Sequence, residues 1–253
     1  MPLSHELLDT WLDHASYTVR EKKNYHRELD NYLYPHKSKN RLYDVKSFIK
    51  REFYDEIKEP RIINAPSDML KAVVAPYIKA IENVVYDHHY VQHHTREEVA
   101  EMLHRVEYNF RLLYETDYSS FEGTFSPELM HACELVLFKR MLSANQDIYK
   151  IIENVELGQH KLKSRFGPAR GKCYFKGSRL SGCLWTSLAN GFTNQMVVEF
   201  IAHEQRRTHK TLPTHIDYLV EGDDGLIGST QELDWSISGK LGLKLKCKAA
   251  TCA

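Results

Sequence analysis

Two acidic side chains stand side by side in a glycine-flanked turn near the end of the chain. Asp223 and Asp224 follow the apolar run IDYLVE and lie between Gly222 and Gly225. This order predicts a strand, a tight turn and a second strand. Hard divalent cations such as Mg²⁺ take oxygen ligands, commonly one or two carboxylates together with substrate phosphates. The turn is therefore a candidate metal site, although an Asp-Gly hairpin turn is also a common surface feature.

A third carboxylate closes a second apolar segment. Asp117 is the last residue of RLLYETD, which begins at Arg111 and predicts a short buried strand. If this strand lies beside the one that leads to Asp223, their carboxylates can hold a pair of metal ions ~3.5–4 Å apart. Such a pair activates an attacking hydroxyl and stabilises the leaving group in phosphoryl transfer. We therefore expect Asp117 and Asp223 on adjacent antiparallel strands; the alternative for Asp117 is a turn residue or a helix cap.

A polar pattern, S-G-x₃-T-x₃-N, occurs in the segment SGCLWTSLANGFTNQ. Its members are Ser181, Gly182, Thr186 and Asn190. Thr186 and Asn190 are four residues apart and so share one face of a helix, from which polar side chains could read a ribose hydroxyl. Gly182 lets the backbone come close to a ligand. The alternative is a helix N-terminus with a serine cap and buried small polar residues.

A basic strip precedes these segments in KSFIKREFYDEIKEPRIINAPSD. Lys50, Lys58 and Arg61, together with Lys46 and Arg51, stand in a stretch that is otherwise extended and interleaved with apolar residues. Such a strip can neutralise a triphosphate or a nucleic-acid backbone. A solvated basic face is the simpler explanation for the run taken alone.

These residues need elements to hold them, and the sequence predicts an α+β arrangement. The first forty residues favour polar helices, and residues 68–86 carry apolar side chains at helical spacing. Ser126 is a good N-cap, with Pro127 in the first helical position. The core stripe of that helix is expected at Leu129, Cys133, Val136, Leu137 and Met141. With a further helix over about 182–206 and a hairpin over 215–229, the prediction is a small antiparallel sheet backed by helices.

Charge is segregated along this chain of 253 residues, whose formal net charge is zero. Residues 20–79 hold fourteen Lys and Arg against nine Asp and Glu, and residues 139–179 hold ten against three. Residues 81–135 reverse the balance with three against eleven, and residues 217–237 hold six acids and no Lys or Arg. Basic walls around an acidic metal-binding floor suit a phosphate polymer with a divalent cation. Solvated helix faces are the other explanation of these blocks.

The remaining composition indicates an ordinary globular protein of a reducing compartment. Five cysteines without a CxxC pair are expected to be free and structural. No apolar run approaches the ~18 residues of a membrane span, and the start of the chain does not predict a secretory signal. In HHYVQHH, His89 and His93 have the i, i+4 spacing of a zinc site on a helix. Apart from Asp87, no further ligand stands at a fitting distance, which favours a polar loop or helix end instead.

In their order, the four chemical segments resemble motifs F, A, B and C of the RNA-directed RNA polymerases of positive-strand RNA viruses, nearest to the tombus-like and noda-like groups. K-x-E-x₅-K-x₂-R, from Lys50 to Arg61, resembles motif F, and TDYSSFEGTFSPEL resembles motif A. SGCLWTSLANGFTNQ resembles motif B, LVEGDDGLIGS motif C and, less specifically, KLGLKLKCK motif D. The resemblance covers about residues 46–248. Four ordered motifs are far more specific than any one of them.

The resemblance implies a role for each motif residue. Asp117 and Asp223 would bind two Mg²⁺ (or Mn²⁺) ions, with Asp224 supporting them. Recognition of the ribose and the template would fall to Glu122, Ser181, Gly182, Thr186 and Asn190. The triphosphate of the incoming nucleotide would be held by Lys50, Lys58 and Arg61. Glu122 departs from the family, which has an aspartate there, so its carboxylate reaches one methylene further. The motif D lysine that protonates pyrophosphate has three equivalent candidates, Lys244, Lys246 and Lys248.

The resemblance also implies a right-hand polymerase fold, with residues 1–110 in the fingers and residues 111–253 in the palm. A fingers insertion is expected at about 145–178, and the family's thumb is expected to be missing. Implied partners are template and product RNA, ribonucleoside triphosphates and the rest of a viral replicase polyprotein. The expected location is the host cytoplasm, in membrane-associated replication complexes reached through other parts of the replicase. The alternatives are a reverse transcriptase or another palm-type polymerase, and a non-catalytic RNA-binding fragment.

Overall fold

The computed structural model describes residues 2–35, 41–53, 55, 59–166, 169–177, 179–209 and 215–250. The chain divides into two compact units, one of residues 1–81 with 135–186 and the other of residues 82–134 with 187–253. Each unit combines helices with a four-stranded sheet, which confirms the predicted α+β class. The predicted boundary between fingers and palm at residue 110 stays a prediction.

The second unit is built on a sheet with the strand order β6-β7-β3-β8, in which all neighbours are antiparallel. Its strands are β3 (Leu112–Tyr118), β6 (Ile216–Glu221), β7 (Asp224–Ser229) and β8 (Leu245–Ala249). Its helical elements are α4 (Arg96–Asn109), η2 (Phe121–Thr124), α5 (Pro127–Ala132), α8 (Thr186–His209, apart from its first residue) and η3 (Trp235–Leu241). β3 and the β6–β7 hairpin occupy the segments where the apolar runs predict strands.

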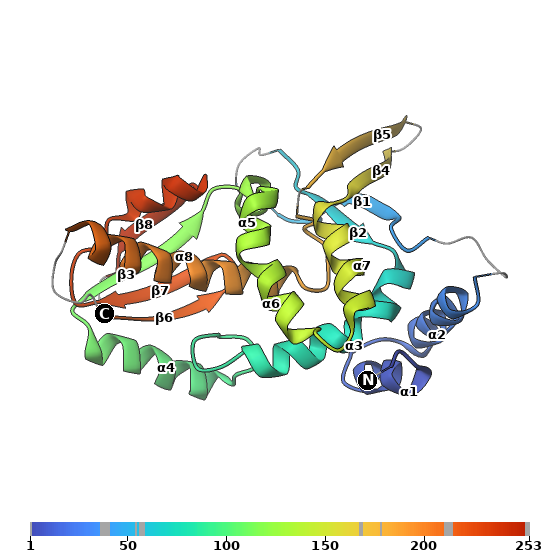
Figure 1. Ribbon diagram of the computed structural model, residues 1–253, viewed down its shortest axis with the longest axis horizontal. Coiled ribbons are helices and arrows are strands. Elements are labelled where there is room, and N and C mark those ends of the chain that lie inside the picture. The colour runs from blue at the N-terminus through green and yellow to red at the C-terminus, as the bar shows by residue number, and fades with distance from the viewer. Residues whose placement is uncertain are drawn as a thin grey trace. The chain divides into compact units, whose positions relative to one another are not determined.

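Helices cover both faces of this sheet (Figure 1). On one face, α4 packs against the sheet through an apolar cluster of Met102, Val106, Leu113 and Leu219. On the other face, α8 contacts the hydroxyl groups of Tyr118 and Tyr218. Because side chains alternate along a strand, Asp117 lies on the α4 face, opposite to its neighbour Tyr118.

The helix predicted after Ser126 forms, but it ends early. Ser126 Oγ accepts a hydrogen bond from the Leu129 N–H, as expected of an N-cap. At Cys133 the backbone leaves the helical region (φ −112°, ψ −97°), and a separate helix, α6 (Glu134–Met141), follows. Beyond the break the predicted core stripe is wrong at Val136, which is 55% exposed, whereas Leu137 and Met141 are half-buried. The apolar side chains that are fully buried there are Leu135, Phe138 and Leu142.

The first unit holds a sheet with the order β2-β1-β4-β5. Its strands are β1 (Val45–Ile49), β2 (Ile62–Pro66), β4 (Gln159–Phe166) and β5 (Ala169–Lys176). Its helices include α1 (His5–Leu12), α2 (Val19–Leu33), α7 (Gln146–Leu157) and the larger part of α3 (Asp68–Val85). β1 and β4 pair in parallel, while the other two pairs are antiparallel. The sequence analysis did not predict this sheet, because its central pair joins strands about a hundred residues apart.

Local sequence signals account for the starts of several helices. α2 opens with a capping box in which Thr18 and Glu21 satisfy each other's backbone N–H groups, and α4 opens with the same device at Thr95 and Glu98. The apolar helix predicted over residues 68–86 forms as α3, and its middle, residues 72–78, is buried on all sides. Within the described ranges, no helix has both the length and the apolar character that a membrane crossing requires.

Candidate active site

In the sheet of the second unit, the pairing of β3 with β7 places Asp117 close to the pair Asp223–Asp224. β3 and β7 are paired as far as Thr116 and Gly225. Asp117 follows Thr116 and Asp224 precedes Gly225, so the same register places these two aspartates opposite each other. A Cβ at Gly225 would lie 2.7 Å from Thr116 Oγ1, and glycine therefore lets the two strands approach. Asp223, directly before β7, completes a group of three acids at one end of the sheet.

A two-residue turn joins β6 to β7 and carries Asp223. Glu221 pairs with Asp224 at the end of the hairpin, which leaves Gly222 and Asp223 as the turn residues. The φ of Gly222 is +62°, a left-handed conformation that favours glycine. The local sequence therefore fixes where the turn falls, as the glycine pattern predicted.

A cavity of about 490 Å³ opens on the α4 face of this sheet. Asp117 and Asp224 line it, together with the further acids Glu115 and Glu221. Burial, followed by the negative charges of Asp223, Asp117 and Glu221, raises the pKa of the Asp224 carboxyl. The raised pKa means that the charged form of Asp224 is disfavoured by its surroundings, and a bound cation would reverse this.

Two lysines of β8 bring positive charge to the same cavity. Lys246 pairs with Asp117 in the β3–β8 ladder, and its Nζ lies 3.3 Å from Asp117 Oδ2. Lys248 lines the cavity as well. The Asp117 side chain is 51% exposed, and its Oδ1 accepts a hydrogen bond from the Tyr118 N–H at 2.7 Å. The structure thus places two of the three candidate motif D lysines at the acidic cavity.

The donors of this site suit a hard divalent cation. Asp117, Asp223 and Asp224 offer anionic oxygens, the ligands that Mg²⁺ and Mn²⁺ prefer. In the part of the chain that the structure describes, no three acidic side chains bring their oxygens within 4.8 Å of one another, these aspartates included. The three acids therefore fit a cation by the chemistry and the charge of their oxygens.

A buried asparagine on α8 holds the aspartate turn from the opposite face. Asn194 Nδ2 donates to the carbonyl oxygens of Gly222 (3.3 Å) and Asp224 (3.0 Å). Its Oδ1 accepts a hydrogen bond from the Tyr118 hydroxyl at 3.0 Å. Asn194 thus connects the end of β3 with both sides of the turn. Asn194 was not among the predicted site residues; the available signal was its place one helical turn after Asn190.

Asn190 and Glu122, two residues predicted to read the ribose, approach each other. Asn190 is buried on α8, and its Nδ2 lies 3.5 Å from Oε1 of the half-buried Glu122 in η2. Asn190 Oδ1 is also buried and has no hydrogen-bond partner among the described residues. A buried acceptor without a partner is costly, so this atom is suited to a hydroxyl group of a ligand.

Ser181, Gly182 and Thr186 belong to the first unit, where the loop before α8 packs on β2. Ser181 Oγ accepts a hydrogen bond from the Asn64 N–H at 3.3 Å, and the Gly182 N–H donates to the Asn64 carbonyl at 3.1 Å. A Cβ at Gly182 would lie 2.8 Å from that carbonyl oxygen, so the close approach requires glycine. Thr186 Oγ1 donates to the Leu180 carbonyl at 3.0 Å. For these three residues, recognition of ribose and template stays a prediction.

Lys50 and Arg61 are neighbours in the first unit. The Lys50 N–H donates to the Arg61 carbonyl at 2.9 Å. Both side chains are exposed and form ion pairs with Glu52, with Arg61 Nη1 at 3.5 Å from Oε1. Lys58 lies outside the described residues. The triphosphate-binding role of the three residues stays a prediction.

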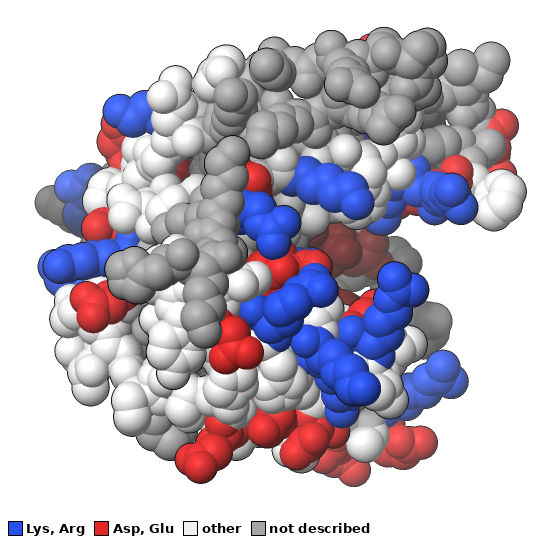
Figure 2. All heavy atoms as spheres, turned by 90° about the vertical axis from the view of Figure 1, so that its right-hand side faces the viewer, with Lys and Arg blue, Asp and Glu red and all other residues white. Residues whose placement is uncertain are grey.

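A further basic strip follows one side of α2. Arg20, Lys23 and Arg27 recur at helical spacing and line the same groove, next to Asn24. Figure 2 views the molecule from the side on which α2 lies in Figure 1, and Lys and Arg side chains gather in the lower part of that view. Such a strip can contact a phosphate backbone, although a solvated helix face has the same composition.

An antiparallel sheet covered by helices, with three carboxylates at one end, is compatible with the polymerase palm that the motifs predict. The family model for viral RNA-dependent RNA polymerase matches residues 68–247, a range that contains all three aspartates and the whole α8 motif. The chain belongs to this family.

Relatives from two groups of viruses resemble the chain. Over 195 residues it is 29% identical to the RNA-directed RNA polymerase of Striped jack nervous necrosis virus. This stretch covers 74% of this chain and 19% of the relative. For the RNA-directed RNA polymerase of Greasy grouper nervous necrosis virus, the identity is 28% over 217 residues, or 82% of this chain and 22% of the relative. A genome polyprotein of Theiler's murine encephalomyelitis virus is 23% identical over 128 residues, 51% of this chain and 5% of the polyprotein. The chain thus spans about a fifth of the nervous necrosis virus polymerases.

Proposed function

We propose that this chain is the catalytic part of an RNA-directed RNA polymerase that copies an RNA template during viral genome replication. The observation that carries the proposal is the β3–β7 register, which sets Asp117 opposite Asp224 beside the Asp223 turn. The family match and the names of the relatives support the reaction class. On this proposal the second unit is the palm and the first contributes to the fingers of a right-hand polymerase.

Asp117, Asp223 and Asp224 would hold two divalent cations, Mg²⁺ or Mn²⁺. When bound, these ions activate the 3′-hydroxyl of the growing strand and stabilise the charge on the pyrophosphate that leaves. The chain's own residues keep the acids in place: the β3–β7 ladder aligns two of them, and Asn194 holds the backbone of the turn. Lys246 and Lys248, at the same cavity, are the candidates that would donate a proton to pyrophosphate.

The nucleotide would be held from several sides. Glu122 and Asn190 would accept and donate hydrogen bonds to the ribose hydroxyls, because Asn190 Oδ1 is buried without a partner in the described structure. Contacts to ribose and template would also come from Ser181, Gly182 and Thr186. The triphosphate would be bound by Lys50, Lys58 and Arg61. These assignments follow the motif resemblance.

The partners would be template and product RNA, ribonucleoside triphosphates and other parts of a viral replicase. A place within a larger replicase polyprotein is supported by the relative that is named a genome polyprotein. The protein would act in the host cytoplasm, in membrane-associated replication complexes to which other parts of the replicase attach it.

Single-nucleotide incorporation on a primed RNA template tests the proposed activity in the complete replicase. Asp117→Asn removes one anionic ligand and should lower incorporation by at least ~10³-fold, which corresponds to several kcal/mol at ~1.36 kcal/mol per tenfold. The matched control is Glu97→Gln, an exposed acid in the first turn of α4. Equal incorporation by both variants would refute the assignment of Asp117.

Sugar choice tests the ribose pocket separately. Asn190→Ala should weaken the preference for ribonucleotides over deoxyribonucleotides by about 1–3 kcal/mol, the value of a buried hydrogen bond to a hydroxyl. The measurement compares kcat/KM for ATP and dATP. An unchanged ratio in the variant would reject Asn190 as a ribose-reading residue.

A further inference from the structure

A second cluster of potential metal ligands lies outside the acidic cavity, in the loop between α3 and α4. The sequence predicted a polar loop or helix end for HHYVQHH, in which His89 and His93 have the i, i+4 spacing of a zinc site on a helix. The structure forms a loop there and separates this pair. His93 has a φ of +69°, packs edge-on against Tyr86 at 4.8 Å, and approaches Glu82 at 3.7 Å. The residues that come together are instead Asp87, His88 and His89.

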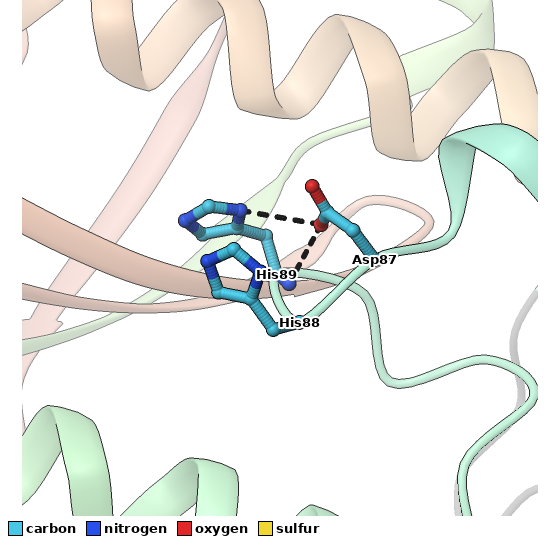
Figure 3. A group of neighbouring side chains, drawn as sticks. All are labelled: Asp87, His88 and His89. Atoms are coloured by element: carbon cyan, nitrogen blue, oxygen red, sulfur yellow. Dashed lines mark hydrogen bonds and ion pairs between the residues drawn. The ribbon is translucent and has the colours of Figure 1, made fainter.

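Asp87, His88 and His89 each offer one ligand atom, and these atoms lie within 4.8 Å of one another. Figure 3 shows the two imidazole rings one above the other, with the Asp87 carboxylate beside them. The ring centroids of the histidines are 4.0 Å apart. His89 Nδ1 lies 3.2 Å from Asp87 Oδ1, close to the ~3.3 Å edge of a tetrahedron with metal–ligand bonds of ~2.0 Å. One pair of donors has this spacing and His88 offers a third within 4.8 Å of both, a set that suits a zinc site with an open fourth position.

The surroundings of His89 are those of a ligand held by an outer carboxylate. Its second ring nitrogen, Nε2, lies 3.5 Å from Asp217 Oδ1 on β6. Asp217 in turn accepts hydrogen bonds from Arg105 Nε at 2.9 Å and Nη2 at 3.2 Å. Histidine ligands commonly donate a hydrogen bond from their free ring nitrogen to an outer carboxylate, which fixes the ring and increases its basicity; here the two atoms approach at an ion-pair distance of 3.5 Å. The His89 ring also stacks on Tyr218, with centroids 4.7 Å apart, so its orientation is fixed from both sides.

An ordinary turn explains part of this arrangement but leaves His88 without a role. Asp87 Oδ1 accepts a hydrogen bond from the His89 N–H at 2.8 Å, as an aspartate at the start of a turn often does. That contact needs neither imidazole ring. His88 is exposed, and in the described structure its side chain has only the ring contact with His89. A bound cation would be coordinated by both imidazole rings, whereas the turn contact from the His89 N–H needs neither. Substitution of His88 therefore distinguishes a metal site from an ordinary turn.

We propose that Asp87, His88 and His89 bind a transition-metal cation of the Zn²⁺ type, at a site separate from the acidic cavity. Asp87 Oδ1 and His89 Nδ1 are two of the ligands, a ring nitrogen of His88 is the third, and water takes the open position. Nitrogen-rich donors favour Zn²⁺ over the hard ions Mg²⁺ and Ca²⁺. The proposal does not depend on polymerase activity.

The loop that holds this site is hydrogen-bonded to the strand that leads to the aspartate turn. The Val220 N–H donates to the His89 carbonyl at 2.8 Å, and the Val91 N–H donates to the Val220 carbonyl at 3.1 Å. Val220 lies three residues before Asp223 on the same segment. A cation bound at the loop therefore stabilises the outer edge of β6, next to the hairpin that presents the acids.

Calorimetric titration of the chain with Zn²⁺ tests the site, with Co²⁺ absorption as a check of tetrahedral coordination. In an Asp117→Asn, Asp223→Asn background, which removes two ligands of the acidic cavity, we expect one equivalent of Zn²⁺ to bind, with affinity at least tenfold weaker when His88→Ala or Asp87→Ala is added. Asp217→Asn removes the outer carboxylate and should weaken binding by about 10–100-fold. The matched control is His104→Ala, because His104 is 85% exposed on α4 and pairs only weakly with Glu107. Circular dichroism establishes that each variant is folded.

Two readouts decide the outcome. If His88→Ala binds Zn²⁺ as tightly as His104→Ala, or if the chain takes up no stoichiometric Zn²⁺, the proposal is wrong and the loop is an ordinary aspartate turn. Zn²⁺ should also slow hydrogen exchange at the Val220 amide in the unmodified chain but not in His88→Ala. An exchange rate that Zn²⁺ leaves unchanged in the unmodified chain would likewise overturn the site.

Discussion

Two acids of the second unit stand in opposite electrostatic surroundings. Asp224 faces Asp223, Asp117 and Glu221, and its pKa is raised by burial and by these charges. Glu204, near the end of α8, receives hydrogen bonds from Arg207 Nε at 2.8 Å and Nη2 at 3.0 Å. Lys240 approaches the same carboxylate at 3.3 Å, and these partners lower the pKa of Glu204 to about 2.

The difference separates an acid that stabilises the fold from acids that are available to a ligand. Glu204 has its positive partners within the chain, so its negative charge is already balanced. The group around Asp224 gathers four carboxylates, with Lys246 beside Asp117. Such a concentration of like charge is unfavourable by itself and becomes favourable when a cation binds. The excess of carboxylates over positive partners therefore marks the group around Asp224, rather than Glu204, as available to a metal ion.

Among the substitutions that test this comparison, Asn194→Ala is expected to have the largest effect on stability. It removes the hydrogen bonds that hold the aspartate turn. The change leaves the Gly222 and Asp224 carbonyls and the Tyr118 hydroxyl without their buried partner. We expect a loss of about 1–3 kcal/mol in the free energy of unfolding, measured by urea denaturation. Incorporation per folded molecule should fall as well, because the acids lose their alignment.

The exposed residue Asn83 on α3 provides the control for that substitution. Asn83→Ala should change the free energy of unfolding by less than ~0.5 kcal/mol, as is usual on a surface. If Asn194→Ala were equally mild, the hydrogen bonds of the buried amide would not hold the turn.

A smaller effect of opposite sign is expected when Asp224 loses its charge. Its raised pKa means that the charged form is disfavoured in the folded state, so this destabilisation grows as pH rises through and above the ordinary value of 3.8. Asp224→Asn should therefore stabilise the chain at pH 7 by ~0.2–1 kcal/mol in the absence of divalent cations. Mg²⁺ should raise the Tm of the unmodified chain more than that of the variant. A larger Mg²⁺-induced rise in Tm for the variant than for the unmodified chain would contradict charge repulsion at Asp224.

Glu204→Gln should destabilise the chain at neutral pH, in contrast to Asp224→Asn, and this loss of stability should depend on pH. A pKa lowered from 4.5 to about 2 means that the stabilising contribution is present above pH 4.5 and is lost as pH falls toward about 2. The variant should thus be less stable than the unmodified chain at pH 7, and the two should converge under acid conditions. The check is Tm against pH at low salt. A difference that is constant across that range would exclude the ion pairs as its cause.

Local patterns were sufficient to predict the elements that carry the chemistry. The apolar run ending at Asp117 and the glycine-flanked Asp223–Asp224 turn are read from neighbours in sequence, and both elements form where predicted. The same holds for the Ser126 cap, because capping depends on residues three positions apart. Secondary structure around the acids was therefore predictable.

Contacts between distant segments were not predictable in the same way. The hydrogen bonds from Asn194 to the aspartate turn depend on packing α8 against a hairpin about thirty residues away. The sequence around one buried asparagine does not indicate its partners. The break at Cys133 overrides a regular helical pattern. Neighbouring histidines in a loop have no fixed direction, so the approach of His88 to His89 and Asp87 appears only in three dimensions. Each of these features is set by tertiary packing rather than by local propensity.

The most direct test of the acidic site is the binding of Mn²⁺, followed by electron paramagnetic resonance of the free ion. The titration is done in a His88→Ala background, so that the loop between α3 and α4 does not contribute. We expect Asp117→Asn and Asp223→Asn each to weaken Mn²⁺ binding at least ~10-fold, since each removes an anionic ligand. Glu204→Gln should leave binding unchanged. Equal Mn²⁺ affinity in all three variants would contradict the assignment of the acids on β3 and at the β6–β7 turn as the metal site.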